Sequence, residues 1–350
     1  MNSITPISVD TRASRLVDMP ALADDTRVTQ TESPLADATG LATPARRVAV
    51  LMATFNGENY LIEQLESLAQ QTWPRINVVV SDDRSTDRTQ RQLARYASGW
   101  SKGSFEITAG PGRGFAANFR SLILAHDAEK ADYVAFCDQD DIWDPAKLEK
   151  AIGWLETLPA GTPGLHCGRT RNFPASASSE FSPLFSRPPC FRNAIVQSIA
   201  GANTMVMNRQ AFRLVQEAAR RTDFVSHDWW SYMIVAGAGG TVRYNPDPDI
   251  LYRQHEGNLV GANNTWAARF TRLQFIFSGR FRQWSDLNIA GLDKCRDLLT
   301  DDACQVLDAF KAARTGRPAA RLKALKRSGV FRQTRKGQAG LVLACMLGLI

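Results

Sequence analysis

The 350-residue sequence has no long apolar run, and its first residues do not form the apolar core of a signal peptide. Nowhere does it reach the roughly 18 consecutive apolar residues that would span a bilayer. The six cysteines lack C-x-x-C spacing, and the four histidines do not pair with them. We therefore expect no zinc site, reduced cysteine thiols and a cytoplasmic protein.

Acidic residues are missing from the last part of the chain. From Lys311 to Ile350 there are ten Lys or Arg residues and no Asp or Glu, whereas the other 310 residues carry 32 basic and 35 acidic side chains. The net charge of +7 therefore belongs to this basic tail. The rest of the chain has no basic excess that would indicate a nucleic-acid partner.

The tail finishes with Ala339–Ile350, twelve residues without a charge. As a helix they would rise about 18 Å, too short for a hydrocarbon core of about 30 Å. One interpretation is that the segment lies in the membrane interface behind its basic neighbours, which would make the protein peripheral on the cytoplasmic membrane face. The alternative is that Leu341–Leu349 packs on the core as a closing helix, with the basic side chains solvated.

Residues 1–45 show no sustained periodicity, and we expect them to form a mobile extension. Beyond them, short apolar runs alternate with helical patterns. The runs are Arg47–Thr54, Ile76–Ser81, Phe105–Ala109 and Tyr133–Cys137. Strands joined through helices make right-handed crossovers and lie parallel. The sequence therefore predicts an α/β fold with a mostly parallel sheet flanked by helices.

The second half of the chain has a looser pattern. Pro and Ser are dense at Pro174–Pro189, which predicts a long loop, and the chain from Trp266 onward is predicted to be helical. Between them we expect strands at Thr204–Asn208 and Ile250–His255 and helices at Gln210–Arg220 and Asp228–Ala236. The expected organisation is a mobile extension (1–45), an α/β domain (46–263) and a basic helical region with an apolar end (264–350).

Three carboxylates directly follow the fourth predicted strand: Asp138, Asp140 and Asp141. Open α/β sheets bind their ligands at the carboxyl ends of strands. A divalent cation would relieve the repulsion between such close carboxylates. Hard oxygen ligands favour Mg²⁺ or Mn²⁺, whose remaining positions can be filled by phosphate oxygens. The alternative is an acidic turn in which Asp144 caps the next helix.

Polar or glycine-rich motifs also follow the first three strands. They are Thr54–Glu58, Asp82–Asp87 and Gly110–Gly114, the last of which leads into the helix that carries Asn118. Their shared position at strand ends predicts a single site. An aspartate there can accept the imide N–H of uracil or thymine, an aromatic such as Phe55 can stack on the base, and glycine lets a ligand approach the backbone closely.

Six motifs occur in order along residues 47–263: MATFNGENYLIEQLESLAQQT, VVVSDDRSTDRT, GFAANF, YVAFCDQDDIWDPAKLE, HDWW and LYRQHEGNLVGA. In this combination the sequence resembles glycosyltransferase family 2, especially its rhamnosyltransferase-like members. The resemblance implies a GT-A fold, a nucleotide-sugar donor, a divalent metal and inversion at the anomeric carbon.

The resemblance also assigns roles by position. Asp83 would read the pyrimidine base, and Asp228 would be the catalytic base. Asp138 and Asp140 would be the metal positions, with Asp140 as the direct ligand. The other donor-binding positions line the base pocket or close over the diphosphate: Thr54, Phe55, Asn56, Glu58, Asn118, Arg253 and His255.

The sequence thus predicts an inverting, metal-dependent glycosyltransferase that uses dTDP-rhamnose or a UDP-sugar. Its acceptor would be a hydroxyl of a bacterial surface glycan or a lipid-linked acceptor. Such transfer needs a base for the acceptor hydroxyl and a cation for the departing diphosphate. Taken alone, Asp228 fits a helix N-cap better than a catalytic base. Two alternatives stay open. A sugar nucleotidyltransferase should show a glycine-rich signature with a basic residue near its first strand, and an inactive glycan-binding module would be expected to lose the acidic cluster or Asp228.

Overall fold

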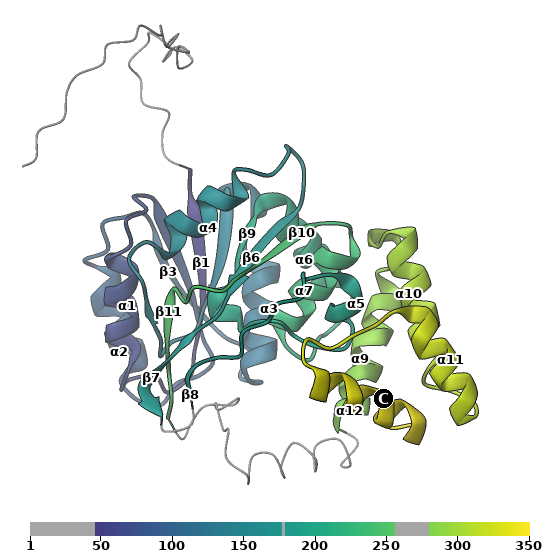
Figure 1. Cartoon of the computed structure of the whole chain (residues 1–350). Coiled ribbons are helices and arrows are strands. Elements are labelled where there is room, and N and C mark those ends of the chain that lie inside the picture. Colours follow the sequence, from purple (N-terminus) through teal and green to yellow (C-terminus); the bar gives the residue numbers. More distant parts are fainter. Residues whose placement is uncertain (1–45, 177–178, 256–279) are drawn as a thin grey trace, which may run out of the picture. The chain divides into compact units, whose positions relative to one another are not determined.

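The computed structural model describes residues 46–176, 179–255 and 280–350 (Figure 1). They belong to one compact unit, Ala45–Ile350. The predicted extension at 1–45 and the predicted domain boundary at 263–264 lie outside the described residues. All six cysteines are described, and all are free thiols.

The main sheet is built from β1 (Val48–Thr54), β2 (Ile76–Asp82), β3 (Phe105–Ala109), β4 (Tyr133–Cys137), β6 (Gly164–Gly168), β9 (Val206–Asn208) and β10 (Thr241–Asn245). Its strand order is β10-β6-β9-β4-β1-β2-β3. Neighbouring strands are parallel except at β9, which is antiparallel to both β4 and β6. The predicted mostly parallel sheet is confirmed, and β1 lies near its middle.

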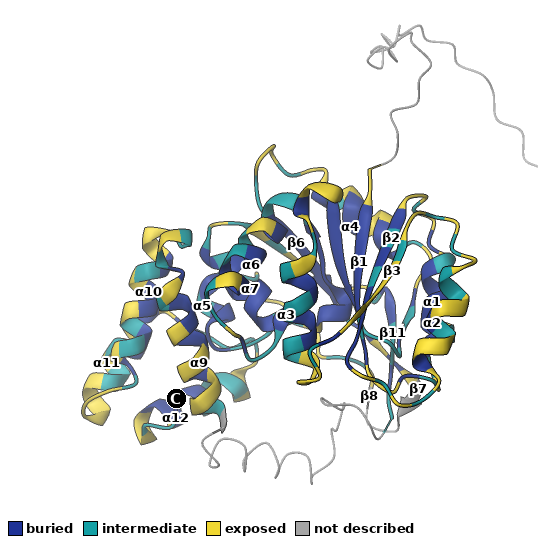
Figure 2. Cartoon of the chain, turned by 180° about the vertical axis from the view of Figure 1, so that it is seen from behind, coloured by how far each residue is buried: buried dark blue, intermediate teal, exposed yellow. Residues whose placement is uncertain are grey.

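Side chains alternate along the strands between two hydrophobic cores. On β1, Val48, Val50 and Met52 lie in one core, whereas Ala49 and Leu51 lie in the other, as the pleat requires. Because both faces are covered, β4 is buried along its whole length and β1 is buried at every residue except Ala53 (Figure 2). The first core includes helices α1 (Leu61–Ala69), α2 (Thr89–Ala97) and α4 (Lys147–Leu155), and the second includes α3 (Phe115–Ala125), α6 (Arg209–Arg221) and α7 (His227–Gly237).

A second, four-stranded sheet was not predicted. It consists of β5 (Ile142–Trp143), β11 (Ile250–Arg253), β7 (Arg171–Ser176) and β8 (Ser179–Phe181), in that order. The loop predicted from residue 174 is therefore wrong at its start, where β7 and β8 form a hairpin. Since β11 pairs with β5, this sheet brings the segment around residue 253 against the acidic loop that follows β4.

The described C-terminal residues are helical, as predicted: α9 (Arg280–Lys294), α10 (Asp301–Ala312), α11 (Pro318–Ser328) and α12 (Arg335–Leu347). They lie beside α6 and the short helix α5 (Phe191–Ala194), and their buried residues join the second core (Figure 1). Gly291 of α9 lies so close to Trp230 of α7 that an added Cβ would be 2.7 Å from the indole ring. The 3₁₀ turns are Ala128–Lys130, Ala202–Thr204 and Arg296–Leu298.

Helix α12, the apolar end of the chain, has two different faces. Leu341 and Cys345 are buried in the second core, so the core-packing interpretation holds for this face. The helix packs on α11 rather than on the main sheet. Leu343, Met346 and Leu347 are exposed on the other face. None of the described helices is both long enough and apolar enough to cross a bilayer.

Candidate active site

The loops after β1, β2 and β4 are joined at the carboxyl edge of the main sheet. Thr54 Oγ1 donates a hydrogen bond to Asp82 Oδ1 (2.9 Å), which ties the end of β1 to the end of β2. The Phe55 N–H donates to Gln139 Oε1 (2.8 Å), and Gln139 Nε2 donates back to the Phe55 carbonyl (3.0 Å). This reciprocal pair connects the first loop to the acidic loop, so motifs far apart in sequence share one site.

The predicted stacking residue, Phe55, is fixed through its backbone while its side chain is 56% exposed. Gly57 leaves space for the Gln139 side chain that holds it, because an added Cβ at Gly57 would collide with the Gln139 amide. Sequence reasoning missed Gln139. The glycine two residues beyond Phe55 was the only local signal of a close approach.

Asn56 and Glu58 hold two loops together. Asn56 adopts a φ of 46°; its N–H donates to Ser85 Oγ (2.8 Å), and its Oδ1 accepts from the Thr86 N–H (2.8 Å). Glu58 Oε2 accepts from the Arg88 N–H (2.8 Å). The polar groups of both residues therefore join the loop after β1 to the loop after β2.

Asp83 binds the glycine-rich loop. Its Oδ1 accepts from the Gly112 N–H (2.5 Å) and its Oδ2 from the Gly114 N–H (2.8 Å), and the residue is only 6% exposed. Both glycines have positive φ (68° and 86°), a conformation that other residues rarely adopt. Each carboxylate oxygen can accept two hydrogen bonds, so Asp83 keeps capacity for a further N–H donor.

Asp82 and Asn118 are internal supports of the same region. Asp82 Oδ2 accepts from the Ser85 N–H (3.1 Å) and from Gln90 Nε2 (2.8 Å), which fixes the turn into α2. Asn118 is 1% exposed, and both ends of its amide contact Ser81 of β2. Asn118 thus positions the start of α3 and does not face the solvent-accessible part of the site.

Asp141, the third carboxylate of the acidic loop, is fully buried. It accepts hydrogen bonds from the Arg253 N–H (3.1 Å) and from the Asn203 amide. Burial, reinforced by the charge of Asp140, raises its pKa. Asp141 therefore joins the acidic loop to β11 and to the 3₁₀ turn at Ala202–Thr204.

Asp138 and Asp140 remain as candidate ligands. Asp140 Oδ2 lies 2.8 Å from His255 Nε2, so these two predicted residues are in direct contact. Burial raises the pKa of Asp138, and the charges of Asp141 and Asp140 raise it further. The acidic loop therefore concentrates negative charge that nearby cationic side chains do not fully compensate.

Helix α1 completes this part of the site. Arg253 Nε donates to the Asp140 carbonyl (2.8 Å), and its Nη2 donates to Glu63 Oε2 (2.6 Å). The Tyr60 ring lies under the Arg253 guanidinium (4.7 Å) and next to the His255 ring (4.9 Å between centroids). Sequence reasoning missed Tyr60 and Glu63, because Tyr60 fits the apolar spacing of α1 and Glu63 resembles an ordinary surface residue.

Asp228 lies half-buried in the first turn of α7, where its Oδ1 accepts from the Trp229 N–H (2.7 Å). Burial raises its pKa, although hydrogen bonds to nearby groups lower it in part. The charge of Asp228 helps to raise the pKa of Asp138, so the two carboxylates are electrostatic neighbours. Tyr252, which was not predicted, is close to the same group: burial and then the charge of Asp138 raise its pKa.

The side chains of this site could supply only part of the coordination of a divalent cation, so a bound ligand would have to supply the remaining donor atoms. Within the described ranges, no three His, Cys, Asp or Glu side chains converge as a preformed metal-binding group. Asp140 and His255 do lie together, with the charge of Asp138 nearby. Mg²⁺ is commonly bound through one or two carboxylates plus substrate phosphates. The residues present therefore suit a cation whose coordination is completed by diphosphate oxygens.

The chain is similar to known glycosyltransferases. Residues 49–211 match the family model described as Glycosyl transferase family 2. The dTDP-rhamnosyl transferase RfbG of Shigella flexneri is 29% identical over 246 residues, which are 66% of this chain and 81% of that protein. An uncharacterized protein of Mycobacterium tuberculosis is 28% identical over 227 residues, which are 64% of this chain and 62% of the relative.

Solved structures also align with this chain, at low sequence identity and with TM-scores below 0.5. The crystal structure of S. aureus TarS 1–349 in complex with UDP-GlcNAc aligns with a TM-score of 0.48 and 16% identity, over 81% of this chain and 89% of that chain. The mannosyltransferase PcManGT from Pyrobaculum calidifontis, in complex with GDP-Man and Mn²⁺, aligns with a TM-score of 0.43 and 19% identity, over 88% and 86% of the two chains.

A mostly parallel sheet with carboxylates and a glycine-rich loop at its carboxyl edge defines an α/β protein of the nucleotide-binding class. Residues 49–211 match the glycosyltransferase family 2 model, which confirms the resemblance of the six motifs to that family.

Proposed function

We propose that this chain is an inverting, metal-dependent glycosyltransferase whose donor is a pyrimidine nucleoside-diphosphate sugar. The observation that carries the proposal is that Asp83, the acidic loop and Asp228 belong to one site at the carboxyl edge of the sheet. The leading donor candidate is dTDP-rhamnose, because the Shigella relative is named a dTDP-rhamnosyl transferase. A UDP-sugar is the second candidate.

Asp83 and Phe55 would bind the base. The Asp83 carboxylate is already oriented by the Gly112 and Gly114 N–H groups, and its remaining lone pairs suit the imide N–H of thymine or uracil. The exposed Phe55 ring offers an apolar face for stacking. Thr54, Asn56 and Glu58 act as the frame of this pocket, and Asn118 supports the glycine-rich loop from behind.

The diphosphate would lie between the acidic loop and β11. Asp140 and His255, with Asp138 beside them, would hold Mg²⁺ or Mn²⁺. A cation bound there stabilises the negative charge that develops on the departing nucleoside diphosphate. Arg253 fixes the acidic loop through the Asp140 carbonyl and keeps a positive charge near the same position.

Asp228 would accept the proton of the acceptor hydroxyl. The hydroxyl oxygen forms a bond to the anomeric carbon as the bond to the diphosphate breaks on the opposite face, which inverts the configuration. The hydroxyl proton passes to the Asp228 carboxylate. Because burial raises the pKa of Asp228, this carboxylate is a stronger base than an exposed aspartate and is still ionised above that pKa.

The proposed acceptor is a hydroxyl of a bacterial surface glycan or of a lipid-linked acceptor, at the cytoplasmic face of the inner membrane. Two features support this location. The last forty residues contain basic but no acidic side chains, and α12 exposes three large apolar residues.

A panel of nucleotide sugars tests the proposed reaction. Purified protein is incubated with dTDP-rhamnose, UDP-sugars and GDP-mannose, with Mg²⁺, with Mn²⁺ or with excess chelator, and release of the nucleoside diphosphate is measured. We expect release from a dTDP- or UDP-sugar and only with a cation. Full activity in chelator, or equal use of GDP-mannose, would contradict the proposal.

Donor binding tests the base pocket separately. Asp83→Ala removes the acceptor of the imide N–H and is expected to weaken donor binding by about 1–3 kcal/mol. Asp301→Ala, at an exposed position on α10, is the matched control and should leave donor binding unchanged. Calorimetric titration with the donor measures both variants.

A further inference from the structure

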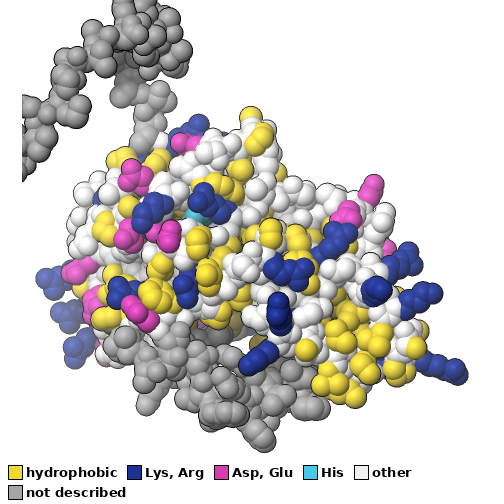
Figure 3. Space-filling view, in the orientation of Figure 1, with side chains coloured by type: hydrophobic (Ala, Val, Ile, Leu, Met, Phe, Trp, Pro, Cys, Tyr) yellow, Lys and Arg dark blue, Asp and Glu magenta, His cyan; other side chains and the backbone are white. Residues whose placement is uncertain are grey.

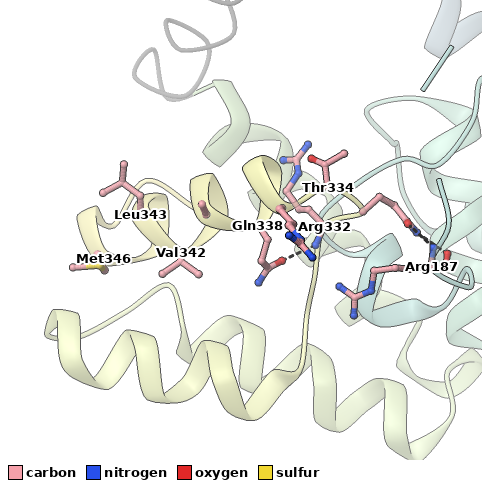
Figure 4. Close-up of a pocket in the computed structure, with 10 residues that line it drawn as sticks. Arg187, Arg332, Thr334, Gln338, Val342, Leu343 and Met346 are labelled. Carbon is pink, nitrogen blue, oxygen red and sulfur yellow. Dashed lines mark hydrogen bonds between the residues drawn. The ribbon is translucent and has the colours of Figure 1, made fainter. Parts of the chain in front are cut away.

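A pocket of about 580 Å³ lies between α12 and the segment that precedes α5. None of its lining residues belongs to the site described above. Three arginines and a strip of α12 contribute to its lining: Arg187, Arg332, Arg335, Val342, Leu343 and Met346. Figure 4 shows arginine side chains at one part of this arginine pocket and apolar side chains along α12 at the other. The pocket thus combines a cationic part with an apolar part.

Glutamine side chains hold the backbone of two of the arginines. The backbone N–H of Arg187 donates to Gln333 Oε1 (3.1 Å), and Gln333 Nε2 donates to the backbone carbonyl of Arg187 (2.9 Å). The backbone N–H of Arg332 donates to Gln338 Oε1 (2.8 Å). The Arg187 guanidinium also lies over the Phe331 ring at 3.4 Å. The pocket is therefore built by specific contacts between two distant parts of the chain.

Within the part of the chain that the structure describes, no carboxylate forms an ion pair with these arginines. Ion pairs in the region use other basic residues: Arg192–Asp302, Lys311–Asp293 and Arg314–Asp286. Among the described residues, no ion pair includes Arg187, Arg332 or Arg335. Burial lowers the pKa of Arg332, as expected of a cation that is partly removed from water.

The apolar part of the pocket continues onto the outer face of α12. Leu343, Met346 and Leu347 are 53%, 42% and 54% exposed, and their spacing places them on one side of the helix. Figure 3 shows hydrophobic side chains gathered over the C-terminal helices with Lys and Arg beside them. An exposed apolar strip next to arginines that form no ion pair with any described residue is the arrangement of a helix that lies in a membrane interface.

We infer that the arginine pocket binds the phosphate head group of an anionic phospholipid in a bilayer surface, with Leu343, Met346 and Leu347 in contact with its acyl region. Guanidinium groups match phosphate oxygens with paired hydrogen bonds. A soluble phosphate would use the arginines alone, whereas a lipid also covers the apolar strip. The inference rests on the proposed membrane location but not on the proposed transfer reaction.

Vesicle binding by the full chain tests the inference. Vesicles of phosphatidylcholine alone are compared with vesicles that also contain phosphatidylglycerol, and co-sedimentation is measured. We expect binding to the anionic vesicles only. The double variant Arg187→Gln/Arg335→Gln should bind roughly tenfold or more weakly, since each basic residue near an anionic surface contributes measurably to attachment. Leu343→Gln/Met346→Gln should also weaken binding.

A matched control separates the pocket from general charge attraction. Lys326→Gln/Arg327→Gln removes two exposed charges from α11, outside the pocket, and should retain most of the binding. Equal losses in this control and in the arginine variant would overturn the inference. So would the absence of vesicle binding, or full competition by glycerol phosphate with no effect of Leu343→Gln/Met346→Gln, which would identify a site for a soluble phosphate compound.

Two further measurements keep the outcome clear. Thermal unfolding of each variant should match the unmodified protein, because the substituted side chains are exposed. Dissociation of a dimer by Leu343→Gln/Met346→Gln, without any vesicle binding, would assign the strip to a second copy of this chain and would overturn the lipid inference. Donor binding is measured in parallel, so failure of the lipid inference is distinguishable from failure of the proposed function.

Discussion

At the scale of single residues, neighbouring aspartates of identical chemistry have different tasks because their partners differ. Asp140 contacts His255 at the open side of the acidic loop, whereas Asp141 is fully buried against Asn203 and the backbone of Arg253. Those two partners of Asp141 lie 62 and 112 residues further along the chain. The residue pattern alone could therefore locate the cluster, and only the family resemblance singled out Asp138 and Asp140 as metal positions.

Asp140→Ala and Asp141→Ala should separate activity from stability. Both substitutions relieve the same repulsion between carboxylates, so the difference between them reports the lost hydrogen bonds. Asp140→Ala is expected to abolish transfer with little change in the free energy of unfolding. Asp141→Ala leaves two buried donors unsatisfied and is expected to cost about 1–3 kcal/mol. Denaturant unfolding and transfer assays measure both. A less stable Asp140→Ala protein would show that the assignment is reversed.

The raised pKa of Asp228 predicts a pH dependence. Transfer should decline as the pH falls through this raised pKa, because the carboxylate then loses its capacity as a base. The folded-state pKa lies above the unfolded value, so the folded protein binds this proton more tightly. The ionised carboxylate therefore costs stability above that pKa, and the cost disappears as the pH falls below the unfolded pKa.

Asp228→Asn should therefore lower transfer by about two to four orders of magnitude without lowering stability at neutral pH. Donor binding should be unchanged if, as proposed, this carboxylate acts on the acceptor hydroxyl and not on the nucleotide. Transfer rates, donor titration and thermal unfolding measure the three quantities. If donor affinity falls together with turnover, Asp228 is a structural residue and the base lies elsewhere.

At the scale of elements, the sequence predicted those strands and loops whose structure depends on residues close to each other in the chain. The strands β3 and β4 were predicted with their observed bounds, and four strand-end motifs were predicted to form one site. By contrast, β5 and β7 pair with β11, far along the chain, and β8 has only three residues, so no local periodicity marks them. Gln139, Tyr60 and Glu63 were missed for the same physical reason: long-range contacts determine their roles.

Glycine substitutions test the element that orients Asp83. Gly112 has a φ of 68°, and alanine there is expected to cost about 1–2 kcal/mol of stability and to displace the N–H that binds Asp83. Gly153 lies in α4 with open space around it, so Gly153→Ala should stabilise the helix by up to about 1 kcal/mol. Urea unfolding and donor titration measure both variants. If Gly112→Ala and Gly153→Ala had equal free energies of unfolding, the positive φ at residue 112 would not require glycine.

At the scale of the whole molecule, the C-terminal helices share a hydrophobic core with the main sheet. Leu341 and Cys345 of α12, and Ile350 after it, are buried in the same cluster as Leu51 of β1 and Trp230 of α7. The last residues are therefore a structural part of the fold, and the apolar strip on α12 is only its outer face.

Deleting residues 338–350 should consequently destabilise the protein. Loss of Leu341 and Ile350 from the core alone is expected to cost roughly 3–6 kcal/mol. The exposed substitution Leu343→Gln serves as the control and should leave the unfolding midpoint unchanged. Thermal unfolding compares the two proteins. A truncated chain with an unchanged midpoint would mean that α12 does not contribute to the shared core.

The reciprocal hydrogen bonds between Phe55 and Gln139 have a thermodynamic consequence for ligand binding. One of these loops carries Phe55, which is proposed to bind the base, and the other carries the carboxylates proposed to lie at the diphosphate. A ligand that orders one loop removes part of the conformational entropy that ordering the other loop would otherwise cost. The base and the diphosphate of a nucleotide sugar would then bind with positive cooperativity. The binding free energy of the intact donor would therefore be more favourable than the sum for its two fragments measured separately.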